Sequence, residues 1–156
     1  MTRHHQTRPG LPDPTVEGWV TVDALRLATL HLVGHSLGGL IAVAYAAAHP
    51  ARVASLTIVD SPLRISPATA DCLARLNRFP RIHYRTLACP ICLIRGADST
   101  VVSHTALARL AALVPAARVA EIPSAHHHVM LDHPEHFGRT LQSFLGRCPS
   151  AAASRP

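Results

Sequence analysis

The stretch "ATLHLVGHSLGGLIAVAYAAAH", residues 28–49, decides the fold of this chain. Residues 28–34 are mainly apolar and end in glycine, which predicts a buried β-strand. Residues 37–49 are rich in alanine and are followed by Pro50, so they predict a helix that ends there. Between the two stands Gly34-His35-Ser36-Leu37-Gly38, a G-x-S-x-G motif in the strand-to-helix context that it requires.

This predicted turn suits nucleophilic chemistry at Ser36. A sharp connection lifts the serine hydroxyl out of the sheet, and glycine is favoured beside it because a Cβ would meet neighbouring backbone. The following helix offers free N–H groups and its positive dipole end to a developing oxyanion. The backbone N–H of Leu37 is the expected oxyanion-hole donor. A chance match in a turn rich in glycine and serine is the alternative.

Strands and helices alternate along the rest of the chain. The predicted strands cover residues 52–60, 90–96 and 117–123, and the predicted helices cover residues 70–77, 103–115 and 132–147. This order predicts the α/β class, with a parallel sheet of about four strands flanked by helices. We expect an irregular lead at residues 1–18, one domain at residues 19–147 that opens with a short helix at 19–27, and a disordered tail at residues 148–156.

Composition limits the classes of function. The net charge is +6 and all basic side chains counted in it are arginines, but they are spread along the chain. Their one concentration, from Arg75 to Arg85, fits a solvated face better than a nucleic-acid site. The longest apolar run, residues 40–48, is too short to cross a bilayer, and residues 1–10 lack the apolar core of a signal peptide. We therefore expect a cytoplasmic location, with no nucleic-acid or membrane partner.

Two of the four cysteines, Cys89 and Cys92, form a C-x-x-C pair in a strand-like run. Residues three apart on a strand point to opposite faces, so the two thiols are badly placed to hold one metal ion. A structural zinc site would also need a second pair of ligands. We interpret these cysteines as buried thiols and expect neither a metal nor another cofactor.

Three segments together resemble the α/β-hydrolase superfamily over about residues 19–146. The most specific are the stretch from His31 to Pro62 and "IPSAHHHVMLDHPEHF", residues 122–137; "PICLIRGADSTVVS", residues 90–103, is less so. The resemblance implies a serine nucleophile, a histidine base after the last strand and an acid between them in the chain. A serine nucleophile implies acyl transfer on carboxylic esters or related acyl substrates.

Three consecutive histidines, residues 126–128, are candidates for the base. Relatives usually have Gly-His here, with a proline seven residues after the histidine. Counting back from Pro134 selects His127, and His126 then stands where relatives have glycine. A neutral imidazole can take the serine proton near pH 7 and return it to the leaving group. A histidine cluster on the surface is the alternative.

Two aspartates compete for the role of the acid, which would hold the tautomer of the histidine. Asp98 follows the third predicted strand, where relatives carry the acid, and it is our preferred candidate. Many relatives instead have aspartate two places later, where this chain has Thr100. Asp60, at the end of the second predicted strand, is the alternative, because some relatives use that position.

The resemblance implies four more strands before the elbow strand, whereas 27 residues precede residue 28 here. A second oxyanion donor normally comes from that region. Two readings therefore stay open: a serine hydrolase, or a truncated and silent relative that at most binds ligands or partners. A third and weaker one is a nucleic-acid-binding domain. The strand at residues 28–34 would have an unpaired apolar edge, so we expect a homo-oligomer to form through it.

Overall fold

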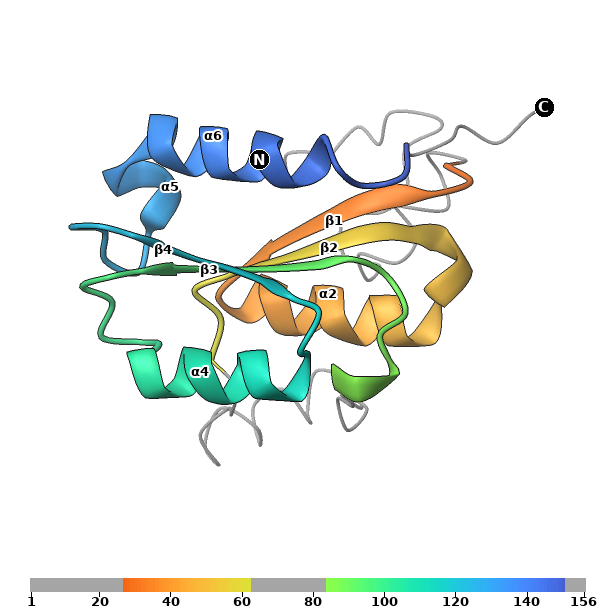
Figure 1. Cartoon of the computed structure of the whole chain (residues 1–156), viewed down its shortest axis with the longest axis horizontal. Helices are drawn as coiled ribbons and strands as arrows, with labels where there is room; N and C mark the ends of the chain where they lie inside the picture. Colours follow the sequence, from red (N-terminus) through yellow and green to blue (C-terminus); the bar gives the residue numbers. More distant parts are fainter. Residues whose placement is uncertain (1–26, 63–83, 151–156) are drawn as a thin grey trace, which may run out of the picture.

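The computed structural model describes residues 27–62 and 84–150, and Figure 1 shows how their helices and strands are arranged. The elements are β1 (Leu30–His35), α2 (Leu37–Ala48), the 3₁₀ turn η1 (Pro50–Arg52), β2 (Val53–Val59), the 3₁₀ turn η2 (Tyr84–Thr86), β3 (Ile91–Gly96), α4 (His104–Leu113), β4 (Arg118–Ile122), α5 (Val129–Asp132) and α6 (Pro134–Leu145). The strands form one parallel sheet in the order β1-β2-β3-β4. Helices α2 and α4 lie on one face of the sheet, and α5 and α6 lie on the other (Figure 1).

This architecture confirms the predicted fold class. All four expected strands are present, with ends within two residues of the expected ones. The expected last helix at residues 132–147 corresponds to α6, which begins at Pro134, and the short helix α5 before it was not predicted. The expected helix at residues 70–77, the lead at residues 1–18 and most of the short helix at 19–27 lie outside the described residues. No helix in the described ranges has both the length and the apolar character that a membrane span requires.

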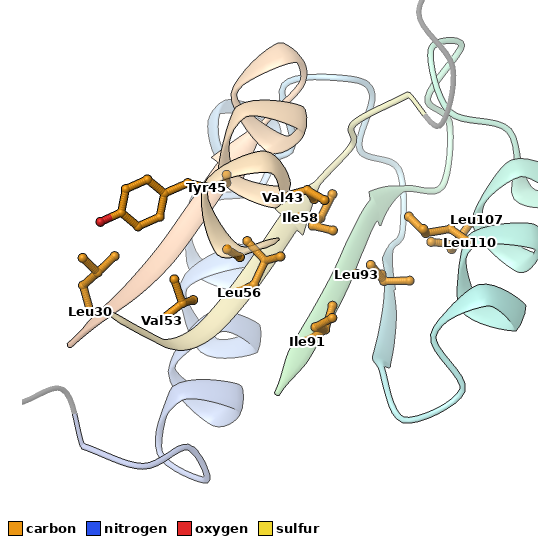
Figure 2. Packing of buried hydrophobic residues seen from close by; sticks show 12 residues of the cluster. Leu30, Val43, Tyr45, Val53, Leu56, Ile58, Ile91, Leu93, Leu107 and Leu110 are labelled. Atoms are coloured by element: carbon orange, nitrogen blue, oxygen red, sulfur yellow. The ribbon is translucent and has the colours of Figure 1, made fainter. Parts of the chain in front are cut away.

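The core consists of two apolar layers, one on each face of the sheet. Leu56 and Leu93 pack with residues of α2 and α4 on one face, as Figure 2 shows. Ile94 and Cys92 pack with Phe144 of α6 on the other. Residues of β3 thus alternate between the faces, and complete burial of each such leucine or isoleucine stabilises the fold by about 1.5–3 kcal/mol. The central strands are buried on both sides, as parallel strands usually are.

The two cysteines of the C-x-x-C pair differ in environment. Cys92 is fully buried, and this burial raises the pKa of its thiol to about 11, so the thiol stays protonated at neutral pH. Cys89 lies before β3 and is half-buried, and burial raises its thiol pKa as well. The interpretation as a buried thiol is therefore confirmed for Cys92 and holds in part for Cys89.

The turn between β1 and α2 depends on close backbone packing. A Cβ on Gly34 would lie 2.3 Å from the carbonyl oxygen of Gly38 and 2.7 Å from the Cα of Gly39, so only glycine fits there without movement of backbone. The N–H of Ser36 donates to the carbonyl of Val59 at 3.0 Å, which ties the turn to the end of β2. The end of β1 is thus held against both its helix and its neighbouring strand.

Strand β1 is an outer strand of the described sheet, pairing there with β2 alone (Figure 1). Two apolar side chains of this part of the chain are exposed: Val33 on β1 is 46% exposed, and Ile41 on the following helix α2 is 42% exposed. Exposed backbone N–H and C=O groups beside apolar side chains favour pairing with another strand. Within residues 27–62 and 84–150, this edge has the character that the sequence predicted.

We predict that the 156-residue chain self-associates through this edge. Size-exclusion chromatography with light scattering at micromolar concentration should show a dimer or larger species. Val33→Lys should weaken association, because a charged side chain on an outer strand opposes pairing. Val119→Lys is the matched control, since Val119 is similarly exposed on β4, the other outer strand of the described sheet. A monomeric wild-type chain would contradict the prediction.

A second prediction concerns the elbow glycines. Gly34→Ala should lower the free energy of unfolding by about 1–3 kcal/mol or more, because its Cβ meets backbone that cannot move independently. Gly38→Ala is the control: its Cβ would meet nothing within 4 Å. In a helix that change stabilises by about 0.5–1 kcal/mol. Urea unfolding of both variants measures the difference, and equal stability of the two would contradict the packing argument.

Candidate active site

The candidate site lies at the carboxyl ends of the parallel strands, where the chemistry of open α/β sheets gathers. Ser36 follows β1, Asp60 follows β2, and His127 lies on the loop after β4. Ser36 has φ 52° and Asp60 has φ 42°, a backbone region that costs a non-glycine residue roughly 1–3 kcal/mol. Two of the three described non-glycine residues with positive φ therefore belong to this cluster, the third being Ser124.

The side chain of His127 bridges the other two. Its Nε2 lies 3.0 Å from the Oγ of Ser36, and its Nδ1 lies 2.9 Å from the Oδ1 of Asp60. A carboxylate can only accept, so Nδ1 carries the proton and Nε2 is free to accept from the serine hydroxyl. The side chain of His127 is 22% exposed, whereas that of Asp60 is fully buried.

The neighbours of His127 do not share this position. His126 has a side chain that is 71% exposed and lies 3.5 Å from Asp132, on the outside of the loop. His128 is exposed, and its ring contacts those of His35 and His127. Of the three consecutive histidines, His127 is the one hydrogen-bonded to Ser36, as the spacing to Pro134 predicts.

The carboxylate in contact with His127 belongs to Asp60, the alternative candidate, and not to Asp98, the preferred one. Asp60 is 1% exposed at the end of β2, between the ends of β1 and β3. Asp98 is exposed on the turn after β3, where its backbone N–H donates to the carbonyl of Ala125 at 2.9 Å. The turn is thus hydrogen-bonded through its backbone to the loop that carries His127, while the side chain of Asp98 is exposed to solvent.

Three donors surround the Asp60 carboxylate. The hydroxyl of Ser99 donates to Oδ1 at 2.6 Å, His127 Nδ1–H donates to the same oxygen, and the N–H of Gly96 donates to Oδ2 at 2.9 Å. Both oxygens of the carboxylate therefore accept hydrogen bonds. Sequence reasoning missed Ser99, although a serine two to three residues before free backbone N–H groups is a recognisable turn former.

The loop that carries His127 is itself held by side chains. His35, from the elbow motif, donates through Nε2 to the carbonyl of His127 at 2.9 Å, and the two rings are 4.5 Å apart. The carboxylate of Asp132 accepts from the N–H of His126 at 2.7 Å. The loop passes so close to β3 that a Cβ on Gly96 would lie 2.1 Å from the carbonyl oxygen of His126. No role for His35 or Gly96 was predicted from the sequence.

The start of α2 supplies the candidate oxyanion donor. Leu37 is the first residue of the helix, so its N–H has no carbonyl acceptor within the helix. It directly follows Ser36, and the helix dipole favours negative charge at this end. The region before β1, from which the resemblance implies a second donor, lies outside the described residues.

Comparisons with known proteins find similarity to α/β hydrolases. Residues 15–82 match the family model of the alpha/beta hydrolase fold. The RutD protein of Variovorax paradoxus, which is named for carbamate hydrolysis, is 45% identical over 56 residues. That match covers 35% of this chain and 21% of RutD, so it extends over about a fifth of the relative.

Solved structures share the fold over a larger part of the chain. An E-2-(acetamidomethylene)succinate hydrolase superposes with a TM-score of 0.68 at 20% identity, over 90% of this chain and 76% of its own. The naproxen esterase of Bacillus subtilis superposes with a TM-score of 0.67 at 20% identity, over 80% of this chain and 62% of its own. The described residues therefore form a four-stranded part of the α/β-hydrolase fold, and residues 15–82 carry sequence similarity to that family.

Proposed function

We propose that this chain is a serine hydrolase that cleaves carboxylic esters or related acyl substrates, with Ser36 as nucleophile, His127 as base and Asp60 as acid. The observation that carries the proposal is the unbroken hydrogen-bonded path from Ser36 Oγ through His127 to Asp60 Oδ1, with steps of 3.0 and 2.9 Å. Nucleophile, base and orienting acid within hydrogen-bond reach of each other are the geometric signature of covalent catalysis.

The proposed reaction has two halves. Ser36 Oγ attacks the carbonyl carbon while His127 Nε2 takes its proton, and the N–H of Leu37 stabilises the oxyanion. His127 then gives the proton to the leaving alcohol or amine as its bond to carbon breaks, which leaves an acyl ester on Ser36. Water, deprotonated by the same nitrogen, attacks this ester, and the carboxylic acid leaves as Ser36 regains its proton.

Two relatives support the choice of acyl chemistry. The Bacillus subtilis protein is named as an esterase and the Variovorax paradoxus protein for carbamate hydrolysis. Esters and carbamates both have a carbonyl carbon that a serine hydroxyl can attack. Because the described triad is hydrogen-bonded throughout, we do not favour the alternative of a silent binding module. A missing second oxyanion donor would still reduce kcat by about 10²–10³.

We predict that a fluorophosphonate probe labels the wild-type chain and not Ser36→Ala. Labelling reports the activated nucleophile and needs no turnover, so it tolerates a weak oxyanion hole. His127→Ala should slow labelling by at least about a thousandfold, because the base is lost. His126→Ala is the matched control and should label like wild type, since that side chain faces solvent. Equal labelling of wild type and Ser36→Ala would refute the assignment.

The acid is tested by two isosteric changes. Asp60→Asn should lower labelling and p-nitrophenyl ester hydrolysis by about 10⁴, because the new amide can donate to Nδ1 and hold His127 in the wrong tautomer. Asp98→Asn should leave both rates near the wild-type values, because its side chain is exposed. An inactive Asp98→Asn beside an active Asp60→Asn would return the role to Asp98.

A further inference from the structure

The hydroxyl of Ser99 is the shortest contact of the candidate acid. Ser99 is buried on the turn after β3, and its Oγ lies 2.6 Å from Oδ1 of Asp60, 39 residues away in the chain. The same oxygen, Oδ1, accepts the Nδ1–H of His127 at 2.9 Å. Ser99 therefore contacts the atom through which the carboxylate holds the base.

The backbone fixes the direction of this hydroxyl. The N–H groups of Val101 and Val102 both donate to Ser99 Oγ, each at 3.2 Å. A hydroxyl has two acceptor sites and one proton. Because both acceptor sites of Ser99 Oγ are occupied by backbone amides, its hydroxyl proton is directed to Oδ1 of Asp60.

The two oxygens of Asp60 are thereby fixed separately. Gly96 N–H holds Oδ2 at 2.9 Å, and the Ser99 hydroxyl holds Oδ1. Two donors from one turn set the plane of the carboxylate, and this plane determines where the imidazole of His127 can donate. Without the hydroxyl, Oδ1 would be held only by the Nδ1–H of His127, the group that the carboxylate has to orient.

The turn does not rely on the hydroxyl alone. The buried guanidinium of Arg95 donates to the carbonyl oxygens of Val102 and Ser99 and pairs with Glu121. The backbone N–H of Ser99 also donates to the carbonyl of Gly96 at 3.0 Å. Loss of the hydroxyl should therefore remove the contact with Asp60 while the turn keeps its course.

We infer that Ser99 is a positioning residue: it orients Asp60 and, through it, sets the tautomer and direction of His127 toward Ser36. The inference rests on the proposed function, and it adds a fourth member to the hydrogen-bonded path. Ser99 touches no reacting atom, so its loss should affect the rate of the chemical step and not the affinity for a ligand.

Ser99→Ala should lower the maximal rate of phosphonylation of the full chain about 10–100-fold, the range typical when a partner that orients a site group is removed. The probe concentration for half-maximal rate should not change. Ser103→Ala is the matched control: it also deletes one hydroxyl, which caps α4 by accepting the N–H of Ala106 at 3.1 Å. It should lower the melting temperature and leave the phosphonylation rate unchanged.

Proton NMR gives a second measure that does not depend on activity. The Nδ1–H of His127, bonded to a carboxylate, should give a downfield resonance in wild type and in Ser103→Ala. In Ser99→Ala it should shift or broaden. Should Ser99→Ala not fold, Ser99→Cys replaces the hydroxyl by a weaker donor of similar size and carries the same expectations.

Two outcomes would overturn the positioning role: a wild-type phosphonylation rate in Ser99→Ala, or an unchanged Nδ1–H resonance in that variant. Failure of the proposed function looks different, because the wild-type chain itself would not be labelled. The resonance would then still decide whether Ser99 orients Asp60 and His127.

Discussion

The hydrogen bond between His127 Nδ1 and Asp60 Oδ1 is the contact on which the arrangement of this site depends. It joins the end of β2 to the loop after β4, which are separated in the sheet by β3. Since all four strands run parallel, their carboxyl ends meet at one edge, where Gly96 at the end of β3 and Ser99 on the turn after it act as donors. The intervening strand and the turn that follows it thus contribute the groups that hold the Asp60 carboxylate.

The register of the sheet maintains this contact against local strain. Ser36 and Asp60 both have positive φ, each at a cost of roughly 1–3 kcal/mol. Each is compensated by a bond across the sheet: the N–H of Ser36 donates to Val59, and the N–H of Asp60 donates to Ile94 at 2.8 Å. A strained residue persists only where its surroundings over-determine it, and the buried layers on both faces of β2 and β3 meet that condition.

Local sequence patterns were enough to predict the strands, the elbow and the histidine that contacts Ser36. They depend on short-range signals: apolar runs, the glycines around Ser36 and the spacing from His127 to Pro134. The partner of His127 was not predictable in this way. Which aspartate turns inward depends on the positive φ of Asp60 and on the course of the turn after β3, and neither has a local signature. Ser99 was missed because its partner is 39 residues away.

His35 connects the turn that carries Ser36 to the loop that carries His127. It lies next to Ser36, yet its Nε2–H donates to the carbonyl of His127, 92 residues later. Ser36 and His127 are therefore joined twice, once through their side chains and once through His35. A displacement of the end of β1 would therefore change both hydrogen bonds to His127, the one from Ser36 and the one from His35. In the described sheet that end is bonded to β2 on one side, so the position of this outer strand and the alignment of Ser36 with His127 depend on the same few hydrogen bonds.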